Sequence, residues 1–152
     1  MNIIGALSAS ILLAAAGTAS EGWRFVDTGS SNDGIVSAYY VDSYSVVRNG
    51  DTVRFRTTTI FNRTTADRDW DRSITTREGS CAAKASAILT NDYYNHGKLL
   101  EHNTDPGEVR THSEGSMMHG AMSMVCGDEA YAGPVVADPV ASANAEFAKL
   151  GG

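Results

Sequence analysis

Alternating apolar and polar residues between positions 20 and 102 predict a β-rich domain built from short strands. The most regular stretch is 53–61, where valine, phenylalanine and threonine alternate with arginine, threonine and isoleucine. Because strand side chains alternate between two faces, this stretch predicts a central, half-buried antiparallel strand. Shorter runs predict the other strands, at residues 23–26, 35–41, 73–78, 82–94 and 98–102.

Turn-forming residues separate these strands. Residues 28–34 and the polar stretch 62–71 predict loops, and residues 42–45 predict a capped turn. Asn95-His96-Gly97 lies between two strand patterns and predicts the turn of a β-hairpin.

One amphipathic helix is predicted at residues 116–126. Its apolar stripe, which we expect to face the sheet, consists of Met117, Ala121, Met124 and Val125. The predicted strand at 82–94 has small residues at Ala83, Ala85 and Ala87, which indicate that another element packs closely against it. We expect the helix to be this element. Residues 128–138 predict a linker, followed by a loosely attached short helix to residue 150 that begins at Pro139.

The first twenty residues predict a secretory signal peptide. Residues 6–16 are small or apolar, and residues 17–19 are the small residues that a signal peptidase needs, so we expect cleavage near Ala19 or Ser20. A membrane anchor is the alternative, but the run at 3–16 is shorter than the roughly 20 apolar residues that span a bilayer. No cysteine follows the run to carry a lipid. We therefore expect a periplasmic or secreted protein without a membrane span in the mature chain.

Export determines how the two cysteines are interpreted. Cys81 and Cys126 are 45 residues apart and are the only cysteines of the sequence. In an oxidising compartment such a pair predicts one disulfide, which the chain-entropy model values at about 4 kcal/mol. The spacing fits neither a CxxC redox motif nor a zinc site.

Composition and charge restrict the class of partner. The 152 residues are 42% hydrophobic and 20% charged, as expected for one ordinary domain. The net charge of -6 is scattered and includes no basic stripe, so nucleic acid is not a predicted partner. The sequence contains none of the GxSxG, HExxH or phosphate-binding glycine motifs, and its histidines have no nucleophile paired with them. No catalytic residues are predicted.

Two groups of residues are candidates for binding. The first is a set of thioether and imidazole side chains, which suit copper or haem iron, at His112, Met118, His119 and Met122. The alternative is that the methionines fill the core and His119 faces solvent. The second candidate is the aromatic and charged loop around Trp70, either as a contact surface or as a solvated loop whose tryptophan covers the edge of the core.

Several short segments together resemble a known family. Trp23-Arg24-Phe25-Val26, Tyr40-Val41-Asp42 before a serine-rich turn, Arg48-Asn49-Gly50 before a long strand, and the cysteine pair are similar to the surface-adhesin protein E family. The resemblance implies an α+β fold at residues 21–127, in which a C-terminal helix packs through a disulfide on a single antiparallel sheet of about six strands. Residues 1–20 would be the signal peptide and 128–152 a flexible tail.

The same resemblance implies a function. It implies a non-enzymatic, exported bacterial protein. The best-known members of the family bind host matrix and serum proteins, and haem binding is attributed to the family as well. We therefore expect a module that binds a host or envelope protein, through residues that no motif identifies. The alternative is a small-ligand binder that holds haem or copper with the Met and His helix.

Overall fold

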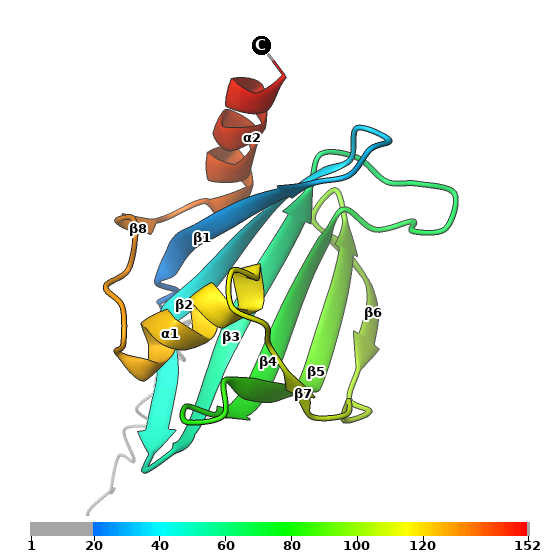
Figure 1. Cartoon of the computed structure of the whole chain (residues 1–152). Helices are drawn as coiled ribbons and strands as arrows, with labels where there is room; N and C mark the ends of the chain where they lie inside the picture. The colour runs from blue at the N-terminus through cyan, green and yellow to red at the C-terminus, as the bar shows by residue number, and fades with distance from the viewer. Residues whose placement is uncertain (1–19, 152) are drawn as a thin grey trace, which may run out of the picture.

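Six long antiparallel strands lie side by side in chain order in the computed structural model, which describes residues 20–151 (Figure 1). They are β1 (Trp23–Ser30), β2 (Val36–Asn49), β3 (Thr52–Phe61), β4 (Arg72–Ser80), β5 (Ala85–Asn95) and β6 (Lys98–Asn103). Two short strands, β7 (Arg110–Thr111) and β8 (Val135–Val136), pair with β5 and β1. The predicted sheet and the hairpin turn at 95–97 are confirmed. The predicted signal peptide lies outside the described residues, apart from Ser20.

The central position of β3 explains its regular sequence. Val53 and Phe55 are fully buried on one face of the sheet, and Thr58 and Ile60 are buried on the other. A half-buried strand was predicted from the alternation, but β3 is covered on both faces because each face of the sheet carries a helix. The threonines satisfy this two-sided burial, since the hydroxyl of Thr58 donates to the carbonyl oxygen of Ser73 at 2.7 Å.

The predicted amphipathic helix is confirmed as α1 (Met117–Cys126). The hydroxyl of Ser116 accepts a hydrogen bond from the backbone N–H of His119, and Gly127 ends the helix in the left-handed region at a φ of 81°. Ala121, Met124 and Val125 are buried as predicted, whereas Met117 is only half-buried. The Cys81–Cys126 disulfide is present and joins the end of α1 to the residue after β4.

The prediction that α1 packs on the alanine-rich strand is wrong. The helix packs against β1, β2 and β3, with Met122 and Val125 over Val53 and Phe55 (Figure 1). The reason lies at the tether: the N–H of Cys81 donates to the carbonyl oxygen of Asp51 at 2.9 Å, which places the cysteine beside the turn between β2 and β3. Of the three alanines, Ala85 has β7 beside it, where Thr111 pairs with it, and Ala87 pairs with Glu78 of β4.

The C-terminal segment also differs from the predicted linker and loosely attached end. The predicted helix is present as α2 (Pro139–Leu150), capped by Asp138, but β8 first joins the edge of the sheet at β1. Ala143 of α2 is fully buried in a core cluster with Trp23 and Tyr40. Register places this cluster on the face opposite α1, so the chain end closes a second core.

One predicted turn and the first part of one predicted loop belong to strands. Residues 42–45 form an irregularity within β2 instead of a turn, because the buried carboxylate of Asp42 accepts from the N–H groups of Gly22 and Tyr44. The strand resumes pairing with β3 at Val47. β1 likewise continues to Ser30, which shortens the predicted loop 28–34.

The second core can be tested with a charge. Ala143→Asp should lower the free energy of unfolding by about 3 to 5 kcal/mol, because it buries an unpaired carboxylate beside Trp23 and Tyr40. Ala145→Asp, on the exposed side of the same helix, should change it by less than about 0.5 kcal/mol. Urea unfolding measures both values. Equal stabilities of the two variants would show that α2 does not pack on the sheet.

The tether can be tested by removing both sulfurs. Replacing Cys81 and Cys126 with serine should lower the free energy of unfolding by about 2 to 5 kcal/mol. A ten-residue helix is too short to persist alone in water, so amides of α1 should lose protection from hydrogen exchange before those of β3. Simultaneous loss of protection in both elements would contradict the proposed role of the bond in docking α1.

Candidate binding surface

Among residues 20–151, no helix lies over the half of the sheet formed by β4, β5 and β6 on the α1 side (Figure 1). Register identifies the side chains on this side, since Phe55 pairs with Arg77, Arg77 with Ile88, and Tyr93 with Glu101. We call this surface the open face. Its strand residues are Ser73, Thr75, Arg77, Ser86, Ile88, Asn91, Tyr93, Glu101 and Asn103.

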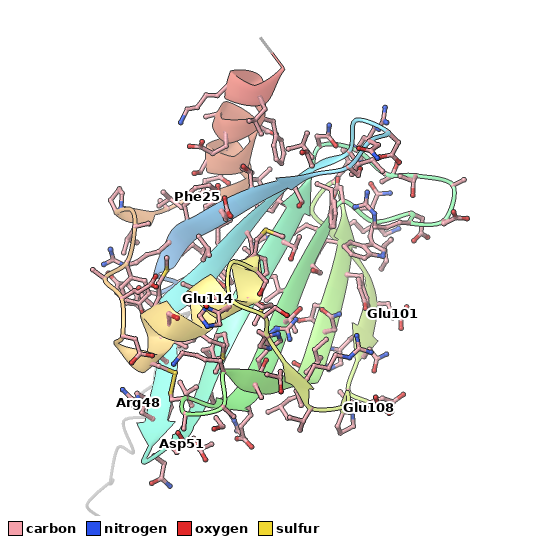
Figure 2. All side chains as sticks on the ribbon, in the orientation of Figure 1. Phe25, Arg48, Asp51, Glu101, Glu108 and Glu114 are labelled. Carbon is pink, nitrogen blue, oxygen red and sulfur yellow. A yellow bond between two sulfur atoms is a disulfide. The ribbon has the colours of Figure 1, made fainter. Side chains whose placement is uncertain are left out.

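Trp70 lines the first hollow of the open face. This hollow has a volume of about 410 Å³ and is lined by Asp69, Trp70, Tyr93, Leu100, Glu101 and Asn103. We call it the Trp70 hollow. Leu100 is 43% exposed, and Figure 2 shows Glu101 on β6, at the edge of the sheet away from α1. The hollow therefore combines aromatic and aliphatic walls with two carboxylates at its rim.

Aromatic packing holds Trp70 in place although it belongs to a loop. Its ring lies 5.4 Å from that of Phe61 and 4.8 Å from that of Tyr93, measured between centroids. The guanidinium carbon of Arg68 lies 3.5 Å from the Phe61 centroid and 5.2 Å from the Trp70 centroid, at the distance of a cation–π contact. Trp70 is half-buried. The tryptophan therefore packs on the side chains of β3 and β5 and also lines the hollow, while its role as a contact surface stays a prediction.

Backbone contacts also fix this loop. The side-chain amide of Asn95 donates to the carbonyl oxygen of Asp69 at 2.7 Å, and the carboxylate of Asp71 accepts from the N–H of His96. Both partners belong to the hairpin turn that joins β5 to β6. The rim of the Trp70 hollow is thus tied to the strands that form its floor.

The second hollow of the open face lies beside α1. It has a volume of about 400 Å³, and its lining residues are Arg77, Ser86, Ile88, Gly107, Glu108, Arg110, His112 and Met118. We call it the Arg77 hollow. The hydroxyl of Ser86 lies 2.8 Å from Nε2 of His112 and forms a hydrogen bond with it.

The structure does not bring the four predicted thioether and imidazole ligands together. His112 and Met118 line the Arg77 hollow, where the sulfur of Met118 accepts a hydrogen bond from the hydroxyl of Tyr39. His119 lines a different hollow with Glu114 and Asp27. Met122 is fully buried in the core under α1.

Helix geometry accounts for this separation. Successive residues of a helix are turned by about 100°, so His119 faces away from Met118, while Met122 lies one turn further along the buried face. Among residues 20–151, no group of three or more histidine, cysteine, aspartate or glutamate side chains is placed to hold a metal ion. Haem or copper binding through His112, Met118, His119 and Met122 stays a prediction.

The sequence reasoning identified Trp70, His112 and Met118 but missed other residues of both hollows. Arg77, Tyr93 and Arg110 were not candidates, although alternation within 73–78 puts Arg77 on the same side as Ser73 and Thr75. The alternation within one strand does not show which strands are its neighbours in the sheet. The order of the strands brings Tyr93 next to a loop that follows β3.

Comparisons with known proteins give one family and one group of structures. The family described as Surface-adhesin protein E matches residues 21–127. Crystal form II of Haemophilus influenzae protein E is 14% identical with a TM-score of 0.48, covering 59% of this chain and 80% of that chain. Protein E from non-typeable Haemophilus influenzae is 15% identical with a TM-score of 0.45, covering 85% and 89%. No curated protein matches.

Within residues 20–151, neither helix has the length and apolar character needed to cross a membrane.

His112 gives a prediction on pH. Burial, aided by the charges of Arg77 and His119, lowers the pKa of His112 below its ordinary value of 6.5. The unfolded chain keeps the ordinary value, so below pH 6.5 it binds more protons than the folded protein, and stability falls as the pH drops through the lowered pKa. His112→Gln should make this decline shallower. Urea unfolding at a series of pH values measures it, with His96→Gln at an 87% exposed side chain as the control. Identical slopes for His112→Gln and wild type would contradict the prediction.

Proposed function

Because this chain belongs to the surface-adhesin protein E family, as its sequence resemblance indicated, we propose that it is an exported protein that binds other proteins and catalyses no reaction. Membership of a surface-adhesin family indicates export. The predicted signal peptide at residues 1–20 supports a periplasmic or secreted location for the mature chain. The proposed partner is a host or envelope protein.

The Trp70 hollow is the observation that carries this proposal. Trp70 and Tyr93 form a tilted aromatic pair beside the exposed Leu100, on the open face, which no helix of the described residues covers. Partly exposed tryptophan and tyrosine side chains supply large contact areas with little loss of conformational freedom. Such residues also account for a large share of binding energy at protein interfaces.

Charge supports a partner with basic side chains. Asp69 and Glu101 flank the Trp70 hollow, and the whole chain has a net charge of -6. Complementary charge raises association rates and excludes acidic partners. We therefore propose that the partner presents an apolar side chain to Trp70 and Tyr93, with lysine or arginine residues around it.

The second candidate function is the small-ligand binder with haem or copper. The observation in its favour is that His112 and Met118, an imidazole and a thioether, line the same hollow. Haem and Cu(I) therefore belong in the test below as separate ligands.

The proposal can be tested by truncating Trp70. The oxidised protein is immobilised, and surface plasmon resonance measures its binding to purified extracellular-matrix and serum proteins, with haem and Cu(I) in separate titrations. Trp70→Ala should weaken the binding of a matrix or serum protein by about thirty-fold, as expected for an interface residue worth about 2 kcal/mol.

Tyr44→Ala is the matched control. Tyr44 is a 60% exposed aromatic residue outside the open face, so its removal should leave the affinity unchanged. The melting temperature of each variant shows whether it is folded. Full affinity of a folded Trp70→Ala variant would contradict the proposed contact surface, and binding of haem or Cu(I) without any protein partner would favour the second candidate.

A further inference from the structure

The Arg77 hollow contains positive charge that the protein does not neutralise. Arg77 and Arg110 line it, and neither forms an ion pair with any carboxylate of residues 20–151. By contrast, Arg54 on the other face pairs with Glu78 at 2.9 Å. Glu108 is the one acidic residue of the lining. Its lining therefore has a net positive charge in a protein whose total is -6.

The guanidinium of Arg77 is also partly removed from water. Its Nε atom is buried and has no hydrogen-bond partner among the described residues. Arg77 is held between neighbours in the sheet, paired with Phe55 on β3 and with Ile88 on β5. A charged group that has lost hydration without gaining an ion pair interacts more strongly with an incoming anion than a solvated surface arginine does.

A comparison within the chain shows that this arrangement is specific to Arg77. Arg68 also has a buried nitrogen without a hydrogen bond, but its guanidinium carbon lies 3.5 Å from the ring centroid of Phe61. The aromatic face compensates that charge. Arg77 has no such ring within cation–π distance among the described residues. Among the described residues, Arg77 therefore combines a buried Nε that has no hydrogen bond with a guanidinium that has no ion pair, although its side chain also contacts Tyr39.

The rest of the lining suits a ligand with an apolar part. Ile88 contributes an aliphatic wall from β5, and Met118 contributes a flexible thioether wall from α1. Gly107 holds its loop against β5, since its N–H donates to the carbonyl oxygen of Ile88 at 2.8 Å. Ser86 and His112 add hydrogen-bonding groups at the same site. A volume of about 400 Å³ is within the usual range for a small-molecule site.

We propose that the Arg77 hollow binds a small molecule with a carboxylate head and an apolar body. The carboxylate accepts hydrogen bonds from Arg77 and Arg110, since a guanidinium matches the two oxygens of a carboxylate. The apolar body lies against Ile88 and Met118. This site is separate from the Trp70 hollow, because the two hollows have no lining residue in common.

The test uses phenylbutyrate as the probe and the oxidised full chain as the protein. Heteronuclear NMR follows the backbone amides of β5 and the Nε–H signals of the arginines during titration. Phenylbutyrate should shift Ser86, Ile88 and the Arg77 side chain. Phenylbutyramide, the neutral analogue, should bind at least about ten-fold more weakly because it lacks the charge that the arginines recognise.

Variants identify the groups that act. Arg77→Gln and Arg110→Gln should each weaken phenylbutyrate at least about ten-fold, and Arg54→Gln, at a paired arginine on the other face, should leave the affinity unchanged. Arg110 is exposed, so its variant remains informative if Arg77→Gln does not fold.

Three results would overturn the proposal. They are equal binding of phenylbutyrate and phenylbutyramide, unchanged affinity in a folded Arg77→Gln or Arg110→Gln variant, and inorganic phosphate binding as tightly as phenylbutyrate. The last result would show an anion site without a role for Ile88 and Met118. Binding of a protein partner through Trp70 is measured separately, so failure of either proposal leaves the other standing.

Discussion

The Cys81–Cys126 disulfide holds α1 across β1, β2 and β3, and the position of this helix decides which half of the sheet meets solvent. The same end of the helix is reinforced by Arg48, whose Nη1 donates to the carbonyl oxygen of Cys126 at 2.6 Å. A cation at the C-terminal end of a helix also interacts favourably with the helix dipole. With the helix fixed in this way, Met118 becomes a wall of the Arg77 hollow, and β4 to β6 stay open.

The opposite face of the sheet carries core packing that stabilises the sheet and leaves the open face uncovered. Trp23 and Tyr40 are fully buried there against Ala143 of α2, and the hydroxyl of Tyr40 donates to that of Ser142 at 2.9 Å. Burying such side chains contributes about 1.5 to 3 kcal/mol each. Most of the core therefore lies around β1, β2 and β3. The strands that carry the two hollows need no helix of their own, since they are anchored through their pairing with β3.

The open face contains two hollows of different chemistry. The Trp70 hollow is aromatic with carboxylates at its rim, and the Arg77 hollow is positive with aliphatic walls. Thr75 and Asn91 occupy the strand positions between them, joined by a hydrogen bond of 2.7 Å. A face of this kind suits a protein that contacts a partner at one end and a small carboxylate at the other. Because both surfaces rest on paired strands, their geometry is set before any partner arrives.

The sequence by itself determined the elements with a strong local signal. Alternation gave the strand at 53–61, apolar spacing gave the helix ending at Cys126, and the two cysteines with a predicted signal peptide gave the disulfide and the family resemblance. Only the tertiary structure decided which strands α1 covers and that Ala143 is buried in a second core cluster. It also decided that Arg77 and Tyr93 lie on the same face of the sheet. The physical reason is that periodicity reports which side chains share a face of one element. Which elements become neighbours depends on contacts between residues far apart in the chain, such as Cys81 beside Asp51 and Trp70 against Tyr93.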